Sequence, residues 1–464
     1  MIGRKDFVEA RMQAFWRPRT NLGKAIGPGI LMAGAAIGGS HLVSSTQAGA
    51  IYGWSLLLLL LLANLFKYPF FLYSVKYRAS TGDTILHGYR RMGKGYLAAF
   101  FGLNLINAFL NVAGVAFITA SLFLNFPFMG DGDHVIAITM GILILCAALI
   151  IAGHYQLLDK IAKVVVFLLA VSTLTAVIVA VWQSVEVPEG FVGRDPWDLA
   201  SIGFIIMFMG WMPAPIDVAA WPSLWRTSRE IQTGHRATMQ ESTTDFHIGY
   251  IVTVVLAVFF LALGALVMYR SGAGIELAEL SSGQFAARFI EMYTSTIGDW
   301  AHWIIVLAAF TAMFSTTITC MDGWPRSLAM STILLFDRPE KGLQRALTAW
   351  IVFTVVVCII IINFFLTDLL SMLQFAMVAS FLSSPVFAWL NYRAIQRPEV
   401  APGDRPGPFM HVLSWAGMAF FVVFTLIFAV WFFGLQEAAE QQREEIMEEE
   451  QALVIPATYG PARA

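Results

Sequence analysis

Two apolar segments of this chain combine helix-breaking residues with polar groups. The first holds Gly34 and then Gly38, Gly39, Ser40 and His41. The second holds Met212, Pro213, Ala214 and Pro215, followed by Asp217. Glycine pairs and a Pro-x-Pro sequence interrupt the helical hydrogen-bond ladder, and at membrane depth such backbone is tolerated only where it is buried in protein or lines a water-filled cavity. We therefore predict a solute-binding site between the two breaks.

The groups around these breaks favour an oxygen-bearing anion. A half-helix that begins near Ser40 would direct free amides and the positive end of its dipole into the cavity. The hydroxyl of Ser40 and the imidazole of His41 can donate hydrogen bonds to the same solute. A second half-helix after Pro213 and Pro215 would add a similar terminus. These features together describe an oxyanion site.

The composition identifies the elements that must position this site. Hydrophobic residues make up 58% of the 464, charged residues 13%, and the mean hydropathy is +0.69. Soluble domains carry about 25% charged residues, so the lipid bilayer is the relevant solvent. We expect an all-α polytopic membrane protein whose three cysteines are buried and inert.

Apolar runs and polar breaks predict eleven membrane spans. Most Lys and Arg residues fall on one side of such a model, which by the positive-inside rule places the N-terminus in the cytoplasm and the C-terminus outside. A bacterial-type inner (plasma) membrane is the expected location. The predicted spans are 25–50, 52–75, 96–125, 134–153, 157–183, 199–222, 246–269, 297–324, 344–364, 367–391 and 408–434.

The two interrupted spans are the first and the sixth, which predicts two halves of opposite orientation with the site at the membrane midplane. The halves cover about 25–183 and 199–391 within a transporter core of 25–391. Residues 1–24 form a cytoplasmic segment, 408–434 an added eleventh span, and 435–464 an extracellular acidic tail.

The first two spans resemble a known family. The sequences Gly27-Pro28-Gly29, Gln47-Ala48-Gly49-Ala50, Tyr52-Gly53 and Ala63-Asn64-Leu65 are similar to those of the Nramp proton-coupled divalent-metal transporters, and Met212-Pro213 matches the start of that family's Met-Pro-His motif. The resemblance implies a LeuT-type fold, a 5+5 inverted repeat plus an eleventh helix with spans 1 and 6 discontinuous.

The departures from this family fall on its metal ligands. Its Asp-Pro-Gly-Asn motif aligns with Gly38 to His41, so Gly38 stands in place of the ligand aspartate and His41 in place of the asparagine. The histidine after Met-Pro is Ala214, and only Met212 of the metal-binding set persists. The third span has no acidic residue, so the acidic residue of the family's proton pathway has no counterpart there.

The substrate prediction follows from these departures. The family's pocket accommodates a single ion, and a dication without a carboxylate partner is strongly disfavoured. Bicarbonate is the leading candidate, with chloride, nitrate and formate left open. The alternative is proton-coupled transport of Mn²⁺ or Mg²⁺ at an atypical Nramp site. Neither enzymatic activity, a cofactor nor a nucleic-acid partner is expected, and the sequence leaves open whether H⁺ or Na⁺ would serve as a coupling ion.

Three further polar residues are candidates for coupling or for the pathway. Asp217 is an intramembrane carboxylate that either functions directly or caps a half-helix. Lys67 would either balance an anion or extend to the interface, as long side chains near helix ends usually do, and we expect the latter. Asn107 shares a face with Asn104 and Asn111, which favours hydrogen bonds between helices, with pore lining as the second reading.

Overall fold

A computed structural model describes residues 21–126, 134–153, 155–182, 193–269, 282–364, 369–439 and 441–442. These residues form helices joined by turns, and no strand occurs among them. The predicted N-terminal segment and acidic tail lie almost entirely outside the described residues.

All eleven predicted spans have helical counterparts. Spans 2, 3, 4, 5, 8 and 9 correspond to α5 (Leu57–Thr81), α7 (Lys94–Phe123), α8 (Val135–Ile151), α9 (Tyr155–Trp182), α14 (His302–Leu335) and α15 (Leu343–Phe364). Span 7 corresponds to α12 (Met239–Leu263) with η4 (Gly264–Tyr269), span 10 to α16 (Leu369–Leu382) with α17 (Ser384–Ile395), and span 11 to α18 (Pro408–Val430) with η9 (Trp431–Leu435). Short helices occupy the connections: α2 (Leu22–Ala25), α6 (Ile85–Met92), α13 (Ser282–Ile297), η6 (Asp299–Ala301), η7 (Glu340–Gly342) and η8 (Pro402–Asp404).

Span 1 is divided into three consecutive segments. They are α3 (Pro28–Ala36), the wider η1 (Ile37–Ser45) and α4 (Thr46–Tyr52). Pro28 begins α3 at a position where no backbone N–H is required. Within η1, Gly38 has φ −71° and ψ −115°, which is outside the helical region. The interruption of span 1 is therefore concentrated at the predicted glycine.

Span 6 contains a true gap between two helices. Its first half, α10 (Leu199–Trp211), ends at an extended Met212. The chain resumes at η3 (Ile216–Ala220) and continues as α11 (Trp221–Thr233). Residues 212–215 are non-helical because Pro213 and Pro215 have no N–H to donate to the preceding turn.

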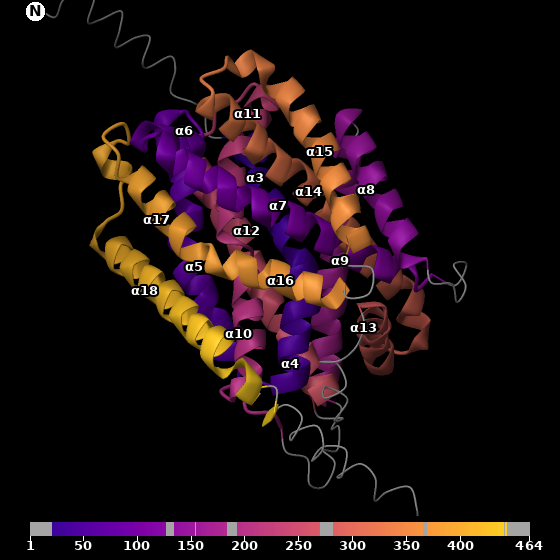
Figure 1. Cartoon of the computed structure of the whole chain (residues 1–464). Helices are drawn as coiled ribbons and strands as arrows, with labels where there is room; N and C mark the ends of the chain where they lie inside the picture. Colours follow the sequence, from indigo (N-terminus) through magenta and orange to yellow (C-terminus); the bar gives the residue numbers. More distant parts are fainter. Residues whose placement is uncertain are drawn as a thin grey trace, which may run out of the picture.

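Close backbone contacts hold the broken span 1 against span 7. A Cβ on Gly29 would lie 2.1 Å from the carbonyl oxygen of Asp245, and a Cβ on Gly49 would lie 2.0 Å from that of Leu261. Such distances are sterically impossible, so glycine is required for this approach. The helices α3, α7 and α12 lie inside the bundle, while α18 lies along one edge (Figure 1).

The edge helices present apolar side chains outward. Val352, Phe353 and Val356 of α15 and Trp415 and Leu426 of α18 are about half exposed or more. This is the surface that a lipid-embedded bundle needs. Eight helices of the described residues are long and apolar enough to cross a membrane, and α8 and part of α9 are shorter apolar helices.

Two features of the fold differ from the sequence prediction. The helices α6 and α13 were not predicted, since one lies among charged residues and the other in a connection of mixed polarity. The helices α11 and α14 end at Thr233 and Leu335, each eleven residues beyond the predicted end of its span. Hydropathy locates the apolar part of a helix, whereas the hydrogen-bond ladder continues into the polar turns.

Candidate functional site

The two interrupted spans enclose a small cavity. It has a volume of about 30 Å³, room for one or two waters or a single small ion. Gly39 and Ser40 line it from span 1, and Pro213 and Ala214 line it from span 6. The remaining lining residues are Ala35, Ala36, Asn111, Val115, Trp211, Pro215, Val218, Trp221, Thr316, Cys320 and Trp324.

Ser40 connects the two breaks. Its Oγ lies 2.9 Å from the carbonyl oxygen of Pro213 and within hydrogen-bond distance of that of Ala36. It also lies 2.7 Å from Nδ1 of His41. A serine hydroxyl has one hydrogen to donate, so it can satisfy only one of these acceptors at a time.

His41 is directed toward α12 and is absent from the cavity lining. Its Nε2 lies 2.8 Å from the carbonyl oxygen of Thr253, and its side chain is fully buried. A carbonyl can only accept, so Nε2 carries the hydrogen, and in a neutral ring Nδ1 accepts from Ser40. The imidazole N–H that the anion prediction assigned to a solute is therefore used within the protein.

The glycines of span 1 are packed against side chains of other helices. A Cβ at Gly38 would lie 2.5 Å from Oγ1 of Thr316, and a Cβ at Gly39 would lie 2.4 Å from the indole of Trp211. Thr316 also donates to the carbonyl oxygen of Gly34 at 2.9 Å. A ligand carboxylate at position 38 would thus require Thr316 to move.

Met212 is separate from the cavity. Its side chain is fully buried within a hydrophobic cluster that includes Leu60, Phe208, Ile216 and Phe421. The thioether that the sequence offered as a soft metal ligand has a packing role in this conformation. A substrate-binding role for Met212 stays a prediction.

Three tryptophans, which the sequence prediction did not single out, form much of the wall. Nε1 of Trp211 donates to Oδ1 of Asn111 at 2.6 Å, and Nε1 of Trp324 donates to Oδ2 of Asp217 at 2.8 Å. Nε1 of Trp221 is buried without a hydrogen-bond partner. The only early signal was their position, because Trp211 directly precedes a predicted break and the other two lie one or two helical turns from a predicted break or polar face.

The asparagines of α7 form hydrogen bonds between helices, as predicted. Nδ2 of Asn107 donates to Oγ of Ser383 at 3.0 Å. Asn104 donates in the same way to Ser327 at 3.0 Å, and Asn111 donates to Ser380 at 3.1 Å. Among the three, Asn111 lines the cavity. A coupling role for Asn107 stays a prediction.

The expectation that the side chain of Lys67 extends to the membrane–water interface is wrong. The side chain is fully buried, and Nζ donates to the carbonyl oxygens of Met209, Gly210 and Ala214 at 2.7, 2.9 and 3.0 Å. These carbonyls lie at the end of α10 and in the gap that follows, where the helix offers them no N–H partners. Sequence alone could not reveal this, because the acceptors belong to another span.

Asp217 is the buried carboxylate beside the cavity. It lies in η3 between the lining residues Pro215 and Val218. While Oδ2 accepts from Trp324, Oδ1 makes no hydrogen bond of good geometry. The carboxylate also interacts with the side chain of Asn107, with the backbone N–H groups of Asp217 and Val218, and electrostatically with Lys67. A buried acceptor without a partner is costly, so this oxygen is available to a ligand or to water.

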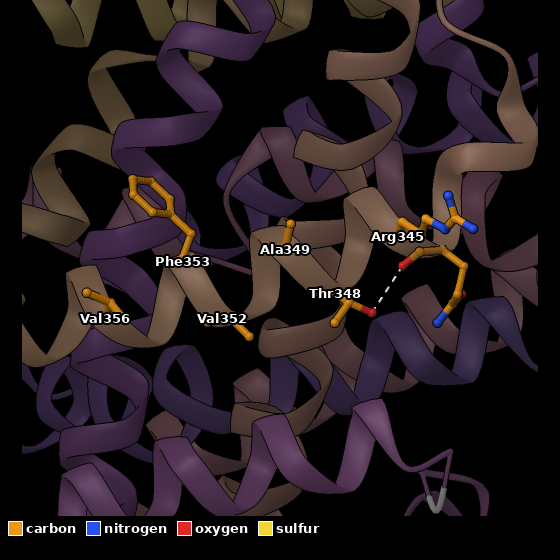
Figure 2. A pocket seen from close by; sticks show the side chains of 7 residues that line it. Arg345, Thr348, Ala349, Val352, Phe353 and Val356 are labelled. Atoms are coloured by element: carbon orange, nitrogen blue, oxygen red, sulfur yellow. Dashed lines mark hydrogen bonds between the residues drawn. The ribbon is translucent and has the colours of Figure 1, made fainter.

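The described residues contain no group of three or more His, Cys, Asp and Glu side chains that could hold a metal ion. The larger hollow, about 720 Å³, is an open groove along α15 (Figure 2). Val352, Phe353 and Val356 line it and face outward, so it belongs to the lipid-facing surface.

A family model described as "Natural resistance-associated macrophage protein-like" matches residues 29–431. The chain belongs to the Nramp family. It is a membrane transporter, and the resemblance seen in its first two spans extends over almost the whole bundle. A relative from Pasteurella multocida strain Pm70, described as "Uncharacterized protein PM0681", is 41% identical over 409 residues, which is 87% of this chain and 91% of the relative.

Two solved structures are similar to this Nramp chain in fold. A variant of the manganese transporter of Eremococcus coleocola has a TM-score of 0.59 at 14% identity and covers 94% of this chain and 93% of its own. MhsT in complex with L-phenylalanine has a TM-score of 0.58 at 14% identity, covering 89% and 99%. The predicted fold class, a LeuT-type inverted repeat with discontinuous spans 1 and 6, is confirmed.

Proposed function

We propose that this Nramp-family transporter carries a small divalent metal ion such as Mn²⁺ or Mg²⁺, and that the ion binds in the cavity between the broken spans. One observation carries the proposal. Oγ of Ser40 meets three acceptors, the carbonyl oxygens of Ala36 and Pro213 and Nδ1 of His41, with one hydrogen among them. An excess of acceptors favours a cation over an anion.

The ligand set would consist of oxygen atoms. Backbone carbonyls and a hydroxyl suit hard cations, and the sulfur of Met212 is held in the hydrophobic core. Asp217 would supply a compensating negative charge through its unpartnered Oδ1. With so few ligands in a cavity of about 30 Å³, the ion would retain part of its hydration shell, as Mg²⁺ commonly does.

The comparisons agree with the metal alternative better than with bicarbonate. The Nramp family was identified above as one of divalent-metal transporters, and the E. coleocola structure is named a manganese transporter. Bicarbonate, our leading prediction from the sequence, has no support from them. The structure also removes two donors on which that prediction depended, because His41 and Ser40 donate within the protein.

Uptake into proteoliposomes tests the proposal directly. Purified protein would be assayed with radiolabelled or dye-reported Mn²⁺ and Mg²⁺, and with labelled bicarbonate as the comparison substrate. We expect saturable metal uptake and no bicarbonate uptake. Bicarbonate flux without metal flux would overturn the assignment.

Two variants and a matched control locate the site. Asp217→Asn removes the negative charge while keeping an acceptor for Trp324, and Ser40→Ala removes the hydroxyl. Both should raise the KM for the metal. Ser44→Ala is the control, because Ser44 is equally buried on η1 and donates to Gly39 without lining the cavity. Equal losses in all three variants would show a general packing defect.

A further inference from the structure

Lys67 has an environment that resembles an ion-binding site more than a side-chain contact. Its ammonium group has three hydrogens, and three carbonyl oxygens lie 2.7–3.0 Å away. Each donor therefore has one acceptor, and all the acceptors belong to the backbone. Rings of backbone carbonyls replace the hydration shell of monovalent cations in selective channels.

The break in span 6 makes these carbonyls available. In a continuous helix the oxygen of Met209 would accept from residue 213, but Pro213 has no N–H. The oxygen of Ala214 would accept from Val218, whose N–H instead bonds Pro215 at 3.2 Å. The end of α10 also carries the negative pole of its helix dipole. Geometry and electrostatics therefore both favour a cation here.

The charge of Lys67 is balanced locally. Asp217, on the other side of the gap, interacts with it electrostatically. Several charged groups of the helices that pack against α5 have other partners. Arg226 of α11 pairs with Asp245 of α12, and Glu230 of α11 pairs with Arg78 of α5 itself. Glu241 of α12 pairs with His235, and Arg90 and Arg91 of α6 pair with Asp337 and Asp83. Tyr89 of α6, which also interacts with Asp217, donates to Asn391.

We propose that Nζ of Lys67 is a tethered cation that occupies a monovalent-cation site formed by the broken sixth span. The chain thus supplies for itself the positive charge that this break requires, and its transport cycle needs no Na⁺ or K⁺ bound there. This site adjoins the substrate cavity, which Ala214 also lines, but the carbonyls proposed to bind the substrate are those of Ala36 and Pro213. The inference does not depend on the proposed substrate.

Removing the lysine should expose the site to free cations. In Lys67→Ala the carbonyls of Met209, Gly210 and Ala214 lose their donors. The truncation also leaves a cavity of about the size of the lysine side chain. Thermal unfolding of the purified variant would be followed in NaCl, KCl, ammonium chloride and methylammonium chloride. Choline chloride at equal concentration is the reference, because its cation is too large to enter.

We expect Lys67→Ala to unfold at a lower midpoint temperature than the wild type in choline chloride. At least one small cation should raise that midpoint most of the way back, with a concentration dependence that saturates. The wild-type midpoint should be equal in all these salts. Lys67→Met, which fills the space without charge, should be destabilised without rescue. Asn64→Ala, which removes another buried polar group of α5, should also be insensitive to the cation.

Two results would overturn the proposal. One is a folded Lys67→Ala variant whose midpoint responds to none of the small cations. The other is a saturable dependence of the wild-type protein on Na⁺ or K⁺, in unfolding or in uptake, which remains measurable even if no variant folds. Absence of metal uptake would instead count against the substrate assignment alone, since the unfolding measurements use no substrate.

Discussion

Arg226 and Asp245 form a buried ion pair in which Nη2 lies 2.7 Å from Oδ2. Both side chains are at most 4% exposed. The same carboxylate accepts from the backbone N–H groups of Gly27 and Gly29 at 2.9 and 2.8 Å, and Arg226 donates to the carbonyl oxygen of Ala25. The pair thus anchors the beginning of span 1 to α11 and α12.

Breaking this pair should loosen the start of span 1. Asp245→Asn leaves the guanidinium buried without its counter-charge, a change that costs roughly 3–5 kcal/mol in buried pairs. We expect a clearly lower unfolding midpoint and faster labelling of a cysteine introduced at Ala25. Glu291→Gln is the control, because its pair with Arg288 is exposed and worth at most about 1 kcal/mol. Equal midpoints for the two variants would contradict this role.

Gly38 and Gly34 provide a matched test of the packing around the first break. A Cβ at Gly38 would overlap Thr316, whereas nothing lies within 4 Å of a Cβ at Gly34. Overpacking a filled site costs typically about 1–3 kcal/mol. Gly38→Ala should therefore lower the unfolding midpoint, and Gly34→Ala should leave it unchanged or raise it slightly. If both alanines are tolerated equally, Thr316 is not the constraint on position 38.

The sequence predicted the interrupted spans well and their side-chain environment poorly. Proline and glycine act on the backbone of their own helix, so the breaks at Gly38 and Pro213 could be located without tertiary information. The partners of Lys67 lie 142 to 147 residues away, and the acceptors exist only because another helix is broken. No local pattern contains such information.

The same limit explains the reassignment of His41. A histidine beside a helix break was a reasonable donor for a solute, but the direction of its ring depends on Thr253 in α12. The tryptophans of the wall were likewise indistinguishable in sequence from lipid-facing or core indoles. Residue type and spacing thus indicated where the site lies, whereas tertiary packing decides which groups face it.

Asp337 gives the transporter a pH-dependent contribution to stability outside the membrane spans. Hydrogen bonds from Lys94 and Arg90, at 2.7 Å each, hold the pKa of its carboxyl below the ordinary value. A lowered pKa in the folded state stabilises the protein above the unfolded-state pKa, and this contribution is lost as the pH falls through the folded-state pKa. The group is exposed, so the contribution should be small and weakened by salt.

Asp337→Asn tests this contribution without disturbing the backbone. Asp337 has φ 49°, a left-handed conformation that asparagine also tolerates. At neutral pH and low salt the variant should unfold at a slightly lower temperature than the wild type, and the two midpoints should converge as the pH falls below the range of free aspartate. A difference that persists in acid would assign the effect to packing instead of charge.

His41→Ala distinguishes a structural histidine from one that binds substrate. Its removal takes one of two donors from the carbonyl oxygen of Thr253, which keeps its hydrogen bond within α12, and a lost buried hydrogen bond costs about 0.5–1.5 kcal/mol. It also frees the hydroxyl of Ser40 from Nδ1. We expect a lower unfolding midpoint with little change in the KM for metal uptake. His41→Gln, whose amide can still donate toward Thr253, should recover part of the midpoint. A large rise in KM with an unchanged midpoint would return His41 to the binding site.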